Sequence, residues 1–156
     1  MDKKEHEGLV EQLTESHSVT SKLLQGVNLE KIVYSDWRIR EIIGHLATWD
    51  RQVTKSIRAF IQGTEYAIED LKIDAFNEET SSKQKGLTSQ QVYDDWEKAR
   101  QDFIAAVEEV PPDLFQKDML YPWGNERGNL SLLVEYMTYH DNEHTTEMLK
   151  ALKAQD

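Results

Sequence analysis

The sequence NLSLLVEYMTYHDNEHTTEMLKALK, residues 129–153, predicts a long amphipathic helix. Apolar residues recur there at steps of three and four, which is the period of a helix with one buried face. His140 and His144 belong to that apolar face and are four residues apart, which is about one helical turn. We therefore expect the two imidazoles to point to the same place inside the protein.

Two earlier segments have the same helical period. Residues 3–25 form the first expected helix, and Gly26 is its stop signal. The second expected helix begins near Ser35 and Asp36, whose side chains suit an N-cap, and it ends at Gly63. Both segments are expected to bury one face against the rest of the protein.

Another long helix is expected over residues 88–110. Thr88 and Gln91 form a capping box at its start, and two prolines follow its end. The connection before it, residues 64–87, contains enough apolar residues to predict a short helix of its own. No alternating strand pattern competes with these helices.

Four long amphipathic helices predict an all-α protein, a four-helix bundle, in a single domain over residues 1–156. The connection between the second and third long helices has 24 residues, enough to carry the chain back along the bundle. These two helices can therefore run parallel, in an up-down-down-up arrangement. A short loop would force them to be antiparallel.

The composition excludes several other classes of protein. No apolar run approaches the roughly 20 residues that span a bilayer, and the first residues lack the apolar segment of a signal peptide. The chain has no cysteine, which excludes disulfides and thiolate zinc sites. We therefore expect a soluble, cytoplasmic protein.

The charge balance is acidic, with 18 basic and 29 acidic residues and a formal net charge of −11. Proteins that bind nucleic acids usually present a basic face to the phosphates. This chain has no cluster of lysine and arginine, and its overall charge would repel DNA and anionic lipids. We therefore expect no nucleic-acid partner and no membrane partner.

A third histidine, His45, lies in the second expected helix. At about 100° per residue it lies roughly 60° from the centre of the apolar stripe, close enough to face the interior. Neutral imidazole is a good ligand for zinc, nickel and iron. His45, His140 and His144 are therefore candidate metal ligands. Three protein ligands leave coordination positions for water or substrate, as in catalytic sites.

Carboxylates near the three histidines could orient the imidazoles or act as a base. Spacing does not choose among Glu41, Asp50, Asp141, Glu143 and Glu147. In the alternative interpretation no metal is bound, and the buried histidines are satisfied by hydrogen bonds to the backbone or to tyrosines. The candidate tyrosines are Tyr34, Tyr93 and Tyr136.

Other histidines and aromatic residues are expected to have structural roles. His6 and His17 lie among polar residues of the first helix, which predicts a surface position. The turn at residues 121–124 is expected to expose its aromatic rings or to form a lid. Helical spacing places three tryptophans in the core, namely Trp37, Trp49 and Trp96.

Several of these motifs resemble one family. WRIREIIGHLATWD, residues 37–50, is similar to the second-helix signature of the DinB/YfiT-like superfamily: Trp, then His-Leu followed by an aromatic residue and an acid. DAFN at 74–77 resembles the Asp-x-Phe-Asn stretch that follows the long loop. YPWG at 121–124, followed by the His-x-x-Glu-His at 140–144, resembles the fourth-helix signature. The order and spacing hold across nearly the whole chain.

This resemblance implies a four-helix bundle of up-down-down-up topology, often a homodimer, that binds a divalent metal through three histidines. The matching positions are His45, His140 and His144. Characterised members are metal-dependent thiol transferases and isomerases that use bacillithiol, mycothiol or glutathione, and some are described as hydrolases. The implied cofactors are a divalent metal (Zn, Ni, Fe or Mn) and a low-molecular-weight thiol.

The sequence therefore favours an enzyme in which a metal activates a thiol or water for transfer to, or hydrolysis of, a small electrophilic substrate. A thiol transferase is favoured over a hydrolase. One alternative is a non-catalytic bundle that binds a small molecule or a partner, with Trp123 and residues 64–87 as its lid. Another is an oligomeric, stress-related protein in which the histidines serve stability alone.

Overall fold

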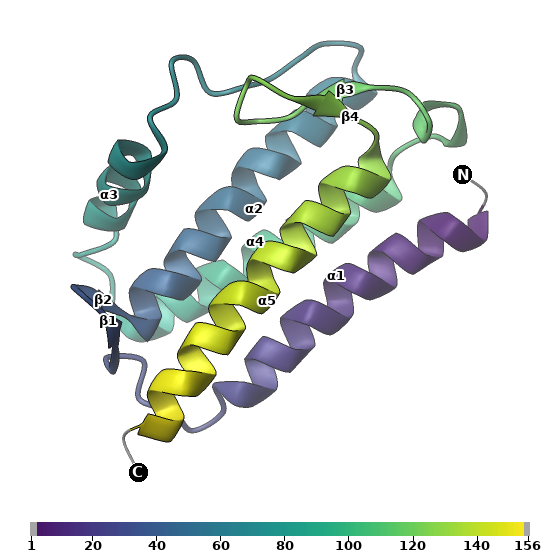
Figure 1. Ribbon diagram of the computed structural model, residues 1–156. Coiled ribbons are helices and arrows are strands. Elements are labelled where there is room, and N and C mark those ends of the chain that lie inside the picture. Colours follow the sequence, from purple (N-terminus) through teal and green to yellow (C-terminus); the bar gives the residue numbers. More distant parts are fainter. Residues whose placement is uncertain (1–2, 155–156) are drawn as a thin grey trace.

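The computed structural model describes residues 3–154, in which four long helices form a bundle (Figure 1). α1 and α5 run in one direction along the bundle, and α2 and α4 run in the other. The predicted all-α class and the up-down-down-up order are confirmed. No helix within the described residues is long and apolar enough to cross a membrane. The long helices are α1 (Lys3–Leu23), α2 (Ile39–Ile61), α4 (Ser89–Glu108) and α5 (Leu130–Ala154).

The long connection after α2 explains the parallel pair. It returns the chain to the start of the bundle and contains the predicted short helix, α3 (Ile73–Lys83), which lies beside α2 (Figure 1). α2 packs most extensively against α4, and α1 packs against α4 and α5. α2 meets α5 over few residues, so the two helices leave room between them.

Two short antiparallel hairpins interrupt the helical pattern. β1 (Ile32–Tyr34) pairs with β2 (Trp37–Arg38) before α2, and β3 (Met119–Leu120) pairs with β4 (Arg127–Gly128) before α5. These hairpins were not predicted, because strands of two or three residues are too short to show an alternating pattern. A 3₁₀ turn, Pro112–Leu114, follows α4.

The first hairpin also corrects the predicted start of α2. Ser35 has a positive φ of 48° and lies in the turn between the strands, so neither it nor Asp36 caps the helix. The helix begins at Ile39, with the extended residue Arg38 at the N-cap position. The side chain of Glu41 accepts a hydrogen bond of 3.0 Å from the backbone N–H of Arg38. Because the strands pair, α2 starts at Ile39, three to four residues after the predicted start at Ser35 and Asp36.

The other predicted helix boundaries agree with the structure. The hydroxyl of Thr88 accepts a hydrogen bond from the N–H of Gln91, 3.1 Å, and the side chain of Gln91 accepts one from the N–H of Thr88, 2.9 Å. This reciprocal pair is the predicted capping box of α4. Gly63 follows the end of α2 with a φ of +79°, a conformation that glycine adopts without strain.

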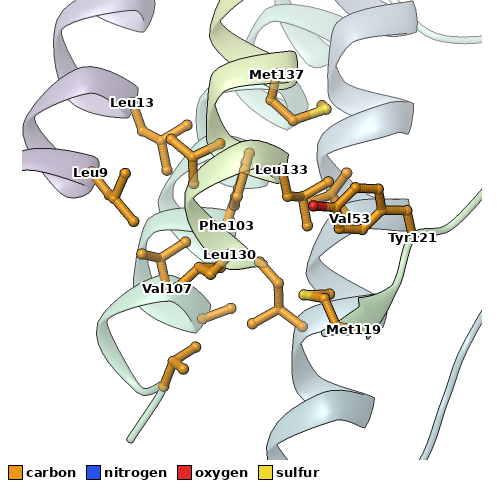
Figure 2. Close-up of a cluster of buried hydrophobic side chains, with 14 of the residues drawn as sticks. Leu9, Leu13, Val53, Phe103, Val107, Met119, Tyr121, Leu130, Leu133 and Met137 are labelled. Atoms are coloured by element: carbon orange, nitrogen blue, oxygen red, sulfur yellow. The ribbon is translucent and has the colours of Figure 1, made fainter. Parts of the chain in front are cut away.

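The hydrophobic core is divided into two clusters. One lies near the β3–β4 hairpin and includes Leu13, Val53, Phe103 and Leu133 from the four long helices (Figure 2). The other lies toward the β1–β2 hairpin and includes Trp96, which is 1% exposed. Buried polar side chains lie at or next to the boundary between the two clusters in each long helix, at Ser16, Asp50, Arg100 and Asp141.

Candidate metal centre

Three histidines from two helices meet at one place. His45 comes from α2, and His140 and His144 come from successive turns of α5. The Nε2 atom of His140 lies 3.0 Å from Nε2 of His45 and 3.2 Å from Nε2 of His144. All three offer a nitrogen within 4.8 Å of the others, so the group could hold a metal ion. The structure thus brings together the three predicted ligands.

The room between α2 and α5 is a cavity of about 880 Å³ whose lining includes all three histidines. α3 covers it through residues such as Asn77, whose Oδ1 accepts a hydrogen bond of 3.0 Å from Nε1 of Trp49. The hairpin before α5 contributes Trp123, and the hairpin before α2 contributes Trp37. Both segments predicted as a lid therefore line the cavity.

His144 and His45 differ in the surroundings of Nδ1, the ring nitrogen that does not face His140. Nδ1 of His144 lies 2.8 Å from a carboxylate oxygen of Glu147, so this nitrogen carries the proton and donates it. Nε2 of His144 then keeps its lone pair toward His140. Nδ1 of His45 is buried and has no hydrogen-bond partner within residues 3–154. Among the five candidate carboxylates, Glu147 is therefore the one that orients an imidazole.

Burial keeps the imidazoles of His45 and His140 neutral. Loss of solvent, together with the smaller effects of His140 and His144, lowers the pKa of His45 from 6.5 to about 3. The pKa of His140 is lowered to about 4, again mainly by burial and then by His144. Both rings therefore offer lone pairs at neutral pH, the form in which histidine binds metals.

The spacing of the nitrogens fits a cation. Ligand nitrogens about 2.1 Å from one ion are about 3.0 Å apart in octahedral geometry and about 3.4 Å apart in tetrahedral geometry. The two separations that involve His140, 3.0 and 3.2 Å, fall in that interval, and all three ligand atoms lie within 4.8 Å of one another. A neutral imidazole has one N–H donor and one lone pair, and His144 turns the lone pair of Nε2 toward this centre because its Nδ1 donates to Glu147. A divalent cation satisfies all three lone pairs at once.

The alternative in which tyrosines satisfy the histidines is wrong. The hydroxyl of Tyr93 pairs with Ser21 at 3.0 Å, and that of Tyr136 donates to Glu126 at 2.7 Å. Tyr34 interacts with Glu147, whose charge, together with burial, raises the pKa of the tyrosine to about 12. None of the three hydroxyls is bonded to His45, His140 or His144 in the described part of the chain.

Two of the five candidate carboxylates, Asp50 and Asp141, bind a buried arginine instead of the histidines. Asp50 and Asp141 are 0% and 3% exposed, and both bind the buried guanidinium of Arg100. The Arg100 nitrogens lie 2.8 and 3.1 Å from the Asp50 oxygens and 2.8 Å from an Asp141 oxygen. Ser16 donates to Asp141 at 2.8 Å and accepts from Arg100 at 3.2 Å. The expectation that either aspartate orients a ring or acts as a base is not supported by these contacts.

We name Ser16, Asp50, Arg100 and Asp141 the ion-pair layer; each long helix contributes one member. Two carboxylates share one guanidinium there, and burial is the main reason that the pKa of Asp50 is raised to about 6. Arg100 was not among the residues predicted from the sequence. Its signal was an arginine four residues after Trp96 and three before Phe103, on the buried face of α4.

The remaining candidates, Glu41 and Glu143, line the cavity. Glu41 is bound by Arg38, whose Nε lies 3.0 Å from both carboxylate oxygens. Glu143 lies between the two α5 ligands in sequence and accepts a hydrogen bond from the Tyr139 hydroxyl. Of the five carboxylates, Glu143 is the one that lines the cavity without binding a histidine or an arginine in the described residues.

The predicted surface position of two histidines was wrong: His6 and His17 are half-buried, because His6 packs against Phe115 and His17 packs against Trp96. Trp37 is half-buried; it packs against the second core cluster as predicted, but it also lines the cavity, with 5.3 Å between its ring centroid and that of His45. The turn that was expected to expose its aromatic rings or to form a lid contributes Trp123 to the cavity lining, and its Tyr121 is 0% exposed and donates to the carbonyl of residue 129.

The chain belongs to the DinB superfamily, whose family model matches residues 11–148. This match covers all three histidines and confirms the family that the motifs predicted. No curated protein matches the chain.

Solved structures agree on the fold. YfiT from Bacillus subtilis, described as a probable metal-dependent hydrolase with an unusual four-helix bundle topology, is 16% identical with a TM-score of 0.75, over 99% of this chain and 90% of its own. The colibactin self-resistance protein ClbS, solved with a double-stranded DNA, is 14% identical with a TM-score of 0.71, over 96% of this chain and 95% of its own.

A mycothiol-dependent maleylpyruvate isomerase is 15% identical, with a TM-score of 0.75. The match covers 91% of this chain but 60% of the isomerase, so this chain corresponds to part of that enzyme. At these identities the likeness establishes the fold, and activity must be argued from the site.

Proposed function

We propose that this protein is a divalent-metal-dependent enzyme that activates a thiol or water for attack on a small electrophilic substrate. The observation that carries the proposal is the convergence of three imidazole nitrogens, 3.0 and 3.2 Å apart, at a cavity of about 880 Å³. The relatives described as a probable metal-dependent hydrolase and a mycothiol-dependent isomerase support it. Thiol transfer is favoured over hydrolysis by the second of these.

His45, His140 and His144 would hold the cation, which is proposed to be Zn, Ni, Fe or Mn. When bound, such a cation lowers the pKa of a thiol or water that it contacts. A low-molecular-weight thiol is the proposed co-substrate. The ligand set leaves coordination positions for it, because three protein side chains do not fill the sphere of these metals.

The chain's own residues supply position and proton transfer. Glu147 holds the His144 ring in one tautomer through its bond to Nδ1. Residues of α3 and Trp123 line the cavity and would contact a bound substrate. Glu143 is the proposed proton acceptor, because it lines the cavity next to the α5 ligands.

Metal analysis tests the proposal most directly. Protein purified without a histidine tag is dialysed against Zn, Ni or Mn, and metal per chain is measured for the wild type and for the triple variant H45A/H140A/H144A. We expect one ion per chain in the wild type and none in the variant. Equal metal content in the two proteins would reject the centre.

A second candidate function is non-catalytic binding of a small molecule in the same cavity, favoured by its volume of about 880 Å³ and by the tryptophans in its lining. It predicts a ligand-dependent rise in melting temperature that survives His45→Ala.

The homodimer, the cytoplasmic location and the lack of a nucleic-acid partner stay predictions. Since ClbS was solved with DNA, a gel-shift assay with duplex DNA is the relevant test of the last one.

A further inference from the structure

The lining of the metal cavity is strongly acidic. It contains a single lysine, Lys85, among the described residues, against five carboxylates. These carboxylates come from the turn before α2, from α2 itself, from α3 and from α5: Asp36, Glu41, Asp74, Glu78 and Glu143. The chain as a whole adds to this field, with its net charge of −11.

Little within the protein neutralises these carboxylates. Arg38 binds Glu41, but no ion pair within residues 3–154 involves Asp36, Asp74, Glu78 or Glu143. Even with a dication held by the three imidazoles, the lining keeps more negative than positive charges.

The same cavity offers surfaces that suit a small cation. Its lining includes Trp37, Trp49, Trp123, Tyr34 and Tyr136. Tryptophan and tyrosine faces attract ammonium groups. His45 is nine-tenths buried at this cavity, and its Nδ1 has no hydrogen-bond partner in the described chain. The lining of the cavity therefore combines the three candidate metal ligands with aromatic side chains and carboxylates.

We infer that the cavity takes small thiols or electrophiles that carry a positive charge, and that it discriminates against anionic ones. The inference rests on the proposed metal-dependent function. It narrows the choice of co-substrate: a thiol with a net negative charge, such as glutathione, is disfavoured. Attraction between unlike charges near a low-dielectric wall provides the discrimination.

The test uses two thiols of equal chain length and opposite fixed charge. Cobalt(II) is loaded into the wild-type protein, and thiocholine (quaternary ammonium) or 2-mercaptoethanesulfonate (sulfonate) is titrated at pH 7.5 and low salt. Binding is followed by the cobalt–thiolate absorption band, with neutral 2-mercaptoethanol as reference. We expect thiocholine to bind about tenfold more tightly than the sulfonate, with a smaller ratio at high salt.

Two neighbouring residues of α3 give a matched pair of variants. Glu78 lines the cavity, whereas Glu79 pairs with Lys83 at 3.3 Å and is absent from the lining. Glu78→Gln should reduce the preference for thiocholine, and Asp74→Asn with Glu78→Gln should reduce it further. Glu79→Gln removes the same charge from the same helix and should leave the preference at the wild-type value.

The outcomes separate the two proposals. If the wild type takes up no cobalt, the proposed function fails. If it takes up cobalt but binds the sulfonate as tightly as thiocholine, the charge inference fails and the metal centre stands. An equal effect of Glu78→Gln and Glu79→Gln would also overturn the inference, because the selectivity would then come from the overall charge of the protein.

Discussion

The bundle contains two buried polar clusters at neighbouring levels, and they differ in how their members are satisfied. In the ion-pair layer, the guanidinium of Arg100 binds Asp50, Asp141, Ser16 and the carbonyl of Leu13. In the histidine cluster, the ring nitrogens face one another, and the charged side chain that contacts them among residues 3–154 is the acid Glu147. The first cluster is built around a buried cation, whereas no cationic side chain bonds to the histidines in the described part of the chain.

This difference separates a structural cluster from a binding site. A buried ion pair with further hydrogen bonds is complete within the fold. Buried imidazoles that present lone pairs to each other need an added positive charge. The two clusters are adjacent in sequence, since Asp141 follows His140 directly. The ion-pair layer therefore ties α5 to α2 and α4 close to the point where the metal ligands must meet.

The largest effect should come from removing a metal ligand. His140 lies between the other two nitrogens, so His140→Ala should abolish stoichiometric metal binding, with at least a thousandfold loss of affinity for zinc, roughly 4 kcal/mol. Competition with a chromogenic chelator measures this. His17→Ala is the control, because His17 lies on α1 against Glu97. If His140→Ala bound zinc as tightly as the wild type, the histidine cluster would not be a metal-binding site, and it would no longer differ from the ion-pair layer in this respect.

Breaking the ion-pair layer should cost stability instead of metal affinity. Arg100→Ala leaves two buried carboxylates without a partner, so the free energy of unfolding should fall by about 3–5 kcal/mol. Urea unfolding of metal-free protein measures it. Replacement of the whole cluster, Asp50→Leu with Arg100→Met and Asp141→Leu, should recover much of the loss. A loss below about 1 kcal/mol in Arg100→Ala would show that the layer is not structural.

The pH dependence of stability should reveal the neutral histidines in the metal-free protein. The pKa values of His45 and His140 are about 3 and 4 in the folded state and 6.5 when unfolded. The unfolded chain therefore binds more protons between pH 6.5 and about 4, and stability falls as the pH is lowered through that range. Each histidine contributes a slope of up to about 1.4 kcal/mol per pH unit.

Asp50 acts in the opposite direction, because its pKa is raised to about 6 and the folded state holds its proton more tightly. This contribution is common to the wild type and to a variant with His45→Asn and His140→Asn. Urea unfolding at pH 7 and pH 5 in the presence of a chelator should therefore show a shallower loss in the variant. Parallel pH curves for the two proteins would contradict the neutral, buried state of the rings.

The smallest of these effects concerns the orientation of one ring. Glu147→Gln weakens the bond to Nδ1 of His144, and we expect metal affinity to fall about 10- to 100-fold with stability nearly unchanged. The same chelator competition measures it. Glu135→Gln, on the exposed side of α5, should have no effect on affinity. Equal affinities of the Glu147 variant and the wild type would show that the ring is held by packing alone.

The sequence predicted much of the helical architecture because helices are encoded locally. The periodic stripes, the capping box at Thr88 and Gln91 and the four-residue spacing of the α5 histidines depend on neighbours within one or two turns. The start of α2 was missed because pairing of the β1 and β2 strands sets it. Strands of two and three residues are too short to show the apolar–polar alternation by which a strand is predicted from sequence.

The sequence therefore predicted the apolar face of each long helix and the inward direction of His45, His140 and His144, but not the buried Arg100 or the partly buried His6 and His17. Tertiary structure decided which inward side chains meet. It assigned Asp50 and Asp141 to Arg100, Glu147 to His144, and Glu143 to the cavity. The physical reason is that a helix fixes directions over a few residues, whereas contacts across the bundle depend on how the helices shift and rotate against each other. Burial, and with it the charge state of every polar group inside, follows only from that packing.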